Sequence, residues 1–274
     1  MVATFKLASE QLSSQDHYDF GMRAVKTVIS SAGNLKRAEP ETAEDLLLIK
    51  ALSDCNLPKF LSDDVPLFQG ILEDLFPGRF LPNPDYSDLI QAVKDAAEQL
   101  NIIPAESFLL KCIQLFETTR VRHGLMLVGP VGGGKTCTTR ALSIALTLLS
   151  QRRPGIYKAV TMHPMNPKSV TMGQLYGEFD VQTHEWTDGL FSVMMREGAM
   201  GSSFDEEDSE SAVGVRRHWY IFDGPVDAVW VESMNTLLDD NKKLCLSSGE
   251  IIKMTPDQTI FFEVGDLAFA SPAT

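Results

Sequence analysis

A short glycine-rich stretch holds the residues whose types and spacing favour phosphate chemistry. Residues 129–136 read Gly-Pro-Val-Gly-Gly-Gly-Lys-Thr and fit the pattern G-x-x-x-x-G-K-[ST]. Glycines let backbone N–H groups turn toward phosphate oxygens, Lys135 can reach the β- and γ-phosphates, and the Thr136 hydroxyl can ligate Mg²⁺. We therefore expect ATP and Mg²⁺ as ligands. The predicted nucleotide-binding residues are Gly129, Pro130, Val131, Gly132, Gly133, Gly134, Lys135, Thr136 and Cys137.

The residues around this loop fit a phosphate site. Residues 124–128 form a short apolar run that predicts a buried parallel strand, and apolar residues recur at helical spacing over 141–148. Strand, loop and helix in this order favour phosphate binding over a flexible glycine turn that binds nothing. Cys137 is expected to be a small residue of the first helical turn rather than a redox group.

A second candidate metal ligand follows another apolar run. Residues 219–222 are aromatic or apolar and lead directly into Asp223. An acid at the end of a buried strand can support Mg²⁺ beside the loop threonine, so Thr136 and Asp223 are the predicted metal pair. The alternative is a turn-initiating Asp before Gly224 and Pro225.

Composition narrows the classes of partner. The 274-residue chain carries a formal net charge of −13, which argues against direct contact with nucleic acid. It has no apolar run long enough to span a membrane and no leader with an apolar core at its start, so no membrane association is expected. Its four cysteines show no C-x-x-C spacing, which favours a reducing compartment over a zinc site.

The pattern along the chain predicts two parts. Residues 1–80 read as helices, the first with an apolar face of Tyr18, Met22, Val25 and Ile29 and an end at 33–34. A Pro-rich break at 81–85 is the expected boundary. Residues 81–274 then predict an α/β module of the P-loop NTPase class, a three-layer α/β/α arrangement.

Within the second part, several further elements are expected. The pattern predicts helices at 86–100, 104–120 and 232–240, a strand at 156–160 that ends at 162–164, and a strand at 260–264. It also predicts a helix with an inserted turn or hairpin in 166–197, an exposed acidic loop at 202–211, and a hairpin of 244–246 with 251–254.

Four runs carry a resemblance to a known family. These runs are 14–26, 166–178, 223–227 and 238–244. They resemble the dynein heavy chain, a microtubule motor of the AAA+ class, and look more like axonemal than cytoplasmic forms. The resemblance covers nearly the whole chain. It implies that residues 1–80 are the helical lid of the ring's first AAA+ module and that 81–274 are the large part of the second.

The resemblance also implies roles and partners. Arg23, in the run Gly21-Met22-Arg23, is similar to a lid arginine that senses the γ-phosphate of the first module. From the residues alone, Arg23 is a solvated or ion-paired side chain. The implied partners are the other AAA+ modules of the same heavy chain, intermediate and light chains through a tail, and the microtubule through a stalk. The implied location is the cytoplasm and cytoskeleton, in the axoneme of a cilium, and an arginine finger is expected to follow residue 274.

The sequence departs from the hydrolytic pattern at Gly224. Hydrolytic AAA+ modules usually carry Glu after the metal-supporting Asp, and Gly224 has no side chain to position water. The next acid is Asp227. The predicted strand at 260–264 lacks the polar γ-phosphate sensor that this class usually places there, and its Glu263 is expected to repel phosphate.

These features predict an ATP-binding module whose nucleotide is structural or regulatory and poorly hydrolysed. One alternative is an active P-loop ATPase or a nucleotide kinase, although Arg196, Arg216 and Arg217 form no recognisable acceptor pattern. A degenerate scaffold that binds no nucleotide is a further alternative, and the complete loop argues against it.

Overall fold

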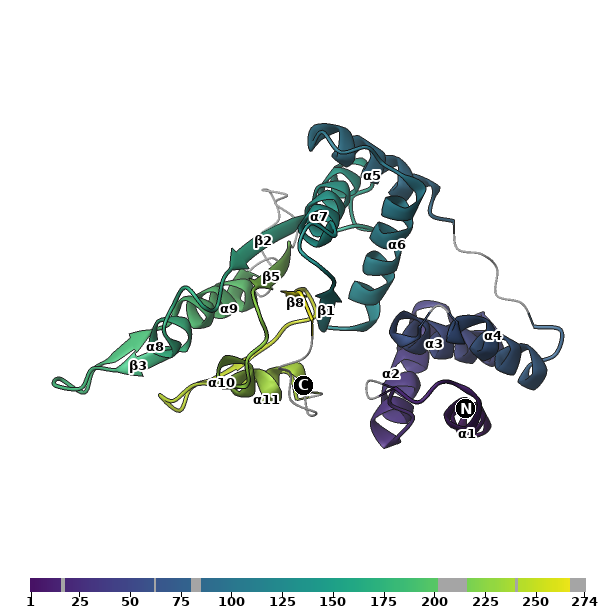
Figure 1. Cartoon of the computed structure of the whole chain (residues 1–274), viewed down its shortest axis with the longest axis horizontal. Coiled ribbons are helices and arrows are strands. Elements are labelled where there is room, and N and C mark those ends of the chain that lie inside the picture. Colours follow the sequence, from purple (N-terminus) through teal and green to yellow (C-terminus); the bar gives the residue numbers. More distant parts are fainter. Residues whose placement is uncertain (16–17, 62, 80–84, 202–215, 240, 267–274) are drawn as a thin grey trace. The chain divides into compact units, whose positions relative to one another are not determined.

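A computed structural model describes residues 1–15, 18–61, 63–79, 85–201, 216–239 and 241–266. The chain divides into two compact units, Met1–Asp85 and Tyr86–Thr274 (Figure 1). The predicted acidic loop at 202–211 and residues 81–84 of the predicted break lie outside the described residues. Within these ranges, no helix combines the length and the apolar character that a membrane span needs.

The first unit is helical in its described part. Its elements are α1 (Val2–Gln11), α2 (Met22–Ala38), α3 (Glu44–Asn56), the 3₁₀ turn η1 (Leu57–Lys59) and α4 (Asp64–Leu75). Helix α1 packs against α4, and α2 packs against α3. Asp64 joins α4 to the chain before α2, because its carboxylate accepts hydrogen bonds from the Ser13 hydroxyl and from the Tyr18 hydroxyl at 2.7 Å. These donors hold the pKa of Asp64 below its usual value.

The predicted apolar face of α2 was wrong. The buried side chains of this helix are Ala24 and Val28, whereas Met22 and Ile29 are exposed and Tyr18 precedes the helix. The predicted end at 33–34 was also wrong, since α2 continues to Ala38. Lys36 lies in its last turn and donates to the carbonyls of Pro40 and Thr42, which satisfies backbone acceptors just beyond the helix.

The second unit is built on a parallel sheet. The order of its strands is β1-β8-β5-β2, and every neighbouring pair is parallel. The strands of this sheet are β1 (Gly124–Val128), β2 (Val160–Met165), β5 (Arg217–Asp223) and β8 (Gln258–Val264). The helices and 3₁₀ turn of the unit are α5 (Ser87–Gln99), α6 (Glu106–Val121), α7 (Lys135–Arg152), α8 (Met172–Tyr176), α9 (Leu190–Gly201), α10 (Ala228–Val231), η2 (Glu232–Met234) and α11 (Asn235–Leu238).

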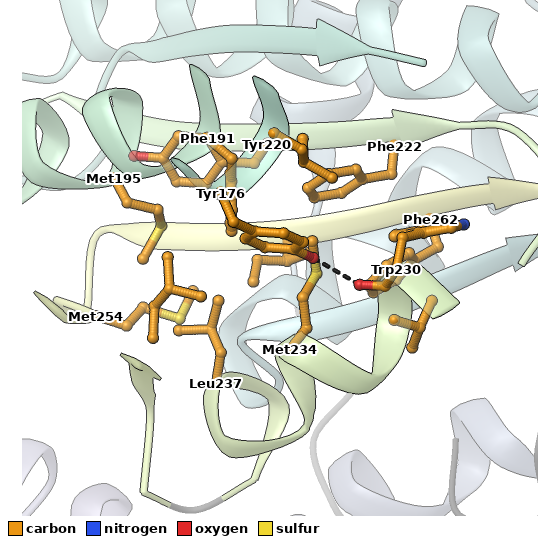
Figure 2. Packing of buried hydrophobic residues seen from close by; sticks show 14 of the residues in the cluster. Tyr176, Phe191, Met195, Tyr220, Phe222, Trp230, Met234, Leu237, Met254 and Phe262 are labelled. Carbon is orange, nitrogen blue, oxygen red and sulfur yellow. Dashed lines mark hydrogen bonds between the residues drawn. The ribbon is translucent and has the colours of Figure 1, made fainter. Parts of the chain in front are cut away.

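Side chains alternate between the two faces of this sheet. Trp219 and Ile221 on β5, with Phe261 on β8, pack in one cluster with residues of α5, α6 and α7. Tyr220 and Phe222 fall on the opposite face. There they pack with side chains of α8, α9, α10, η2 and α11 (Figure 2). Helices therefore cover both faces of the sheet, which confirms the predicted three-layer α/β/α class.

Two predicted elements were misplaced. The strand expected to begin at 156 and to end at 162–164 begins only at Val160 and ends at Met165, and Ile156 is exposed outside it. Strand β2 contains Pro164 because it lies at the edge of the sheet, where a missing N–H is tolerated. The helix expected at 232–240 is divided between η2 and α11, which ends at Leu238.

The α/β unit contains two antiparallel hairpins; the second was expected, and for the first the sequence left a turn or a hairpin open. One pairs β3 (Gly177–Phe179) with β4 (Trp186–Asp188), between α8 and α9. The other pairs β6 (Lys243–Cys245) with β7 (Ile251–Lys253) before β8. Arg196 on α9 connects them, because it forms ion pairs with Asp188 at 3.1 Å and with Glu250 at 2.8 Å.

Candidate nucleotide-binding site

The glycine-rich loop joins β1 to α7 at the carboxyl edge of the parallel sheet. Gly132 and Gly134 have φ values of 80° and 83°, a region that side chains with a Cβ rarely adopt. Gly133 makes a close approach, because a Cβ there would lie 3.0 Å from the carbonyl oxygen of Pro130. The loop therefore needs glycine at 132–134 to hold its turn, which ends where Gly134 caps α7.

The loop faces solvent and presents the start of a long helix. Pro130, Val131, Gly132, Gly133 and Cys137 are exposed, and α7 continues for 18 residues. The first N–H groups of a helix have no partner within it, and the helix dipole makes this end positive. This end of α7 is therefore suited to bind an anion such as a phosphate.

Lys135 folds back over the loop. Its Nζ donates to the carbonyl oxygens of Gly129 at 2.6 Å and of Pro130 at 3.0 Å. These two bonds hold the ammonium group at the loop, where it can exchange carbonyl oxygens for phosphate oxygens. This position fits the predicted role of Lys135 in binding the nucleotide.

Thr136, in the first turn of α7, is hydrogen-bonded to a buried carboxylate. Its hydroxyl donates to one carboxylate oxygen of Glu263. The Thr139 hydroxyl lies 3.0 Å from the other carboxylate oxygen and 3.0 Å from the Lys135 carbonyl oxygen, so two acceptors share its single hydrogen. Glu263 lies on β8, the strand next to β1, and is buried. Its carboxylate thus faces α7 and is hydrogen-bonded to it. The sequence had predicted only that Glu263 repels phosphate, and it did not predict this contact with α7.

Asp223 ends the neighbouring strand in register with Glu263. Both follow, by two residues, side chains that face α7, so Asp223 and Glu263 lie on the same face of the sheet. Asp223 is exposed, and its carboxylate makes no hydrogen bond to the part of the chain that the structure describes. Asp223 thus lies at the same edge of the sheet as the loop, but the direct partner of Thr136 is Glu263, and the metal pair of Thr136 and Asp223 stays a prediction.

These groups fit Mg²⁺ in type. Hydroxyl and carboxylate oxygens are its usual protein ligands, and Mg²⁺ completes its shell with water and substrate phosphates. Among the described residues, no group of three or more His, Cys, Asp and Glu side chains could hold a metal by itself. Thr136 is the residue that would ligate Mg²⁺ here, with the carboxylates of Asp223 and Glu263 on the same face of the sheet.

Gly224 follows Asp223 and lies close to Asn166 and Pro167. A Cβ at this position would lie 3.3 Å from Asn166 Oδ1 and 3.5 Å from Pro167 Cδ, and its backbone is not in the left-handed region. The next acid, Asp227, forms an ion pair with Lys168. The described residues after Asp223 thus offer no free carboxylate directly beyond β5.

Arg23 belongs to the other unit. It lies in the first turn of α2, where its side chain is exposed and its carbonyl accepts a hydrogen bond from the Thr27 hydroxyl at 3.0 Å. Its role toward a nucleotide of another module stays a prediction.

Sequence reasoning missed the partnership of Glu263 with Thr136 and Thr139. The available signal was a single charged residue inside an otherwise apolar run at 260–264. A buried charge needs hydrogen-bond donors, and threonines one turn apart on a neighbouring helix can supply them.

The fold and loop define a nucleotide-binding α/β module of the P-loop class. A family profile described as "AAA domain (dynein-related subfamily)" matches residues 124–271, and one described as "Hydrolytic ATP binding site of dynein motor region" matches residues 1–136. The chain belongs to the dynein-related subfamily of AAA domains.

Curated proteins with similar sequences are much longer than this chain. It is 59% identical over 277 residues to dynein axonemal heavy chain 1 of Mus musculus, covering 100% of this chain and 6% of that protein. It is 51% identical over 274 residues to dynein axonemal heavy chain 12 of Rattus norvegicus, covering 100% and 8%. It is 52% identical over 274 residues to dynein axonemal heavy chain 3 of Homo sapiens, covering 100% and 6%. These findings confirm the predicted resemblance to dynein heavy chains, of which the chain spans less than a tenth.

Proposed function

We propose that this chain binds ATP with Mg²⁺ between β1 and α7 and hydrolyses it slowly or not at all. The observation that carries the proposal is a complete phosphate loop beside a position, Gly224, that has no side chain. Lys135 and the N–H groups at the start of α7 would hold the phosphates, and Thr136 would ligate the metal. When bound, Mg²⁺ would neutralise phosphate charge, but no carboxylate directly after Asp223 would position an attacking water.

The module would serve a dynein motor ring rather than act alone. Similarity to axonemal dynein heavy chains supports this placement, with location at the cytoskeleton and the axoneme of a cilium. Bound ATP would strengthen the interface with neighbouring AAA+ modules, so that hydrolysis elsewhere is transmitted through a rigid ring. Intermediate and light chains, and the microtubule, would be partners of other parts of the heavy chain.

The first unit would be the lid of the preceding module. The profile for a hydrolytic dynein site covers residues 1–136 and thus includes this whole unit, which supports the placement. In that arrangement Arg23 would sense a γ-phosphate bound by a loop outside this chain.

A kinase-like activity has less support. Arg196 is already paired with Asp188 on β4 and with Glu250 in the turn between β6 and β7, so it is not available as a phosphate-binding lid residue. Within the described ranges, no observation favours an acceptor site for phosphoryl transfer.

The first experiment measures ATP binding and phosphate release on one sample of the 274-residue chain. We expect Mg²⁺-dependent binding and turnover near zero. Lys135→Ala should weaken binding about 10- to 100-fold, because charge-assisted bonds to phosphate are lost at about 1.5–3 kcal/mol. Lys111→Ala is the charge-matched control, since Lys111 is exposed on α6 and donates only to Gln114. Binding that Lys135→Ala leaves intact would contradict a nucleotide site at this loop, and clear turnover would favour an active ATPase.

A further inference from the structure

Glu263 is a carboxylate enclosed in the core of the α/β unit. Its side chain is 2% exposed, and every residue of β8 is buried. No Lys, Arg or His in the described part of the chain forms an ion pair with it. A buried carboxylate without a cationic partner is costly, so its hydrogen-bond donors and its neighbourhood must compensate for lost hydration.

The donors come from one face of α7. Thr136 and Thr139 are three residues apart, and their hydroxyls face different oxygens of the Glu263 carboxylate. Thr136 donates to Glu263, whereas the hydrogen of Thr139 is shared between Glu263 and the Lys135 carbonyl. The positive end of the α7 dipole lies at the same turn and further stabilises the charge. The carboxylate is thus fixed in orientation against the residue that the site offers to a metal.

The hydrogen bond from Thr136 to Glu263 determines whether the Thr136 oxygen can ligate a metal. A hydroxyl has one hydrogen to donate and two lone pairs. When the hydrogen is directed to Glu263, the lone pairs of Thr136 point elsewhere and can ligate a cation. Asp223, the conventional candidate for this support, makes no hydrogen bond to Thr136 in the described structure.

We propose that Glu263 is the positioning residue of the magnesium site and acts by accepting the hydroxyl hydrogen of Thr136. Its buried negative charge favours a cation at Thr136 and opposes the phosphates of a nucleotide that arrives without one. Glu263 therefore makes the site selective for the magnesium complex of ATP over free ATP. This inference rests on the proposed function, since it concerns the same loop.

The test compares ATP dissociation constants with Mg²⁺ and with EDTA, measured by calorimetry on the 274-residue chain. We define the ratio as the dissociation constant measured in EDTA divided by the one measured with Mg²⁺. A high ratio means that Mg²⁺ strengthens the binding of ATP. Loss of an outer partner of a metal ligand typically costs 10- to 100-fold in metal affinity. We expect Glu263→Gln to lower the ratio at least tenfold, with binding of free ATP unchanged or tighter.

Thr136→Val provides the mechanistic check. If Glu263 acts through Thr136, Glu263→Gln should lower the ratio no further in a Thr136→Val background. Thr147→Val is the matched control, because the Thr147 hydroxyl on the same helix donates to the Ser143 carbonyl at 2.9 Å and lies three turns from the loop. The control should lose stability but keep the wild-type ratio.

The outcomes separate this inference from the proposed function. Wild-type chain that binds no ATP would contradict the nucleotide site itself. Mg²⁺-dependent binding by the wild type, with the ratio of Glu263→Gln within twofold of it, would overturn only the role of Glu263. If Glu263→Gln does not fold, Glu263→Asp replaces it, because the shorter side chain withdraws the acceptor from Thr136 but keeps the charge. An unchanged ratio in that variant would also overturn the proposal.

Discussion

Restoring a carboxylate after Asp223 tests whether its absence limits hydrolysis. Gly224→Glu places an acid where hydrolytic modules of this class usually have one. The backbone accepts the change, because Gly224 is not in the left-handed region. The new Cβ would meet Asn166 Oδ1 at 3.3 Å and Pro167 Cδ at 3.5 Å, which requires a shift of only tenths of an ångström. We expect the free energy of unfolding to fall by about 1 kcal/mol, because the side chain of Asn166 must shift.

The expected gain in turnover follows from the role of a water-positioning base. General-base catalysis contributes typically 10²- to 10⁴-fold. The late strand of this chain carries Glu263 and no polar phosphate sensor, so we expect a gain at the lower end of that range, about 10²-fold. The dissociation constant for MgATP should change little, because the loop and Thr136 are untouched.

The assay is phosphate release at saturating MgATP, with the rate of the Lys135→Ala variant subtracted as background. Gly224→Gln has the same size as Gly224→Glu but cannot act as a base, and it should stay at the wild-type rate. A Gly224→Glu variant that binds MgATP as tightly as the wild type, yet releases phosphate no faster than Gly224→Gln, would refute the reasoning. The missing carboxylate would then not be what limits hydrolysis.

Two further predictions concern stability. Tyr176→Phe should lower the free energy of unfolding by about 1–2 kcal/mol in a urea titration, because the Tyr176 hydroxyl donates to the buried Trp230 carbonyl at 2.6 Å (Figure 2). Tyr157→Phe is the control, and an equal loss there would contradict this reason. Burial holds the pKa of His163 and His218 below its usual value, so the unfolded chain binds more protons below about pH 6.5. The melting temperature should fall as the pH drops from about 6.5 toward the folded-state pKa, less steeply in His163→Gln. Parallel curves for variant and wild type would argue against this linkage.

The fold was predictable where the signal is local and repeated. The loop, the strand before it and the helix after it were found because a motif with fixed spacing marks all three. The phase of α2 was not found, because its buried positions are occupied by Ala24 and Val28 while the larger Met22 and Ile29 are exposed. Hydrophobic size alone therefore indicated the wrong face of that helix.

Edge position explains how β2 can include a proline. The apolar run at 156–160 predicted a strand that ends at 162–164, yet the ladder with β5 begins only at Val160 and continues through Pro164 to Met165. A central strand would have lost a ladder hydrogen bond at proline, whereas an edge strand can direct that position away from its single neighbour. Sequence alone did not reveal that β2 lies at the edge, because strand order depends on pairings between distant segments.

The role of Glu263 depends on the face of the sheet to which its side chain points. Side chains alternate between the two faces along a strand, so the position of Glu263 on β8 determines that face. Phe261, two residues earlier, packs on the face covered by α7, so the side chain of Glu263 must face α7 as well. Because β8 lies beside β1, that face is where the first turn of α7 begins. A carboxylate there is hydrogen-bonded to threonine hydroxyls of α7. From the sequence alone, Glu263 was expected to repel phosphate. Its position beside Thr136 in the structure makes it a candidate support for the metal.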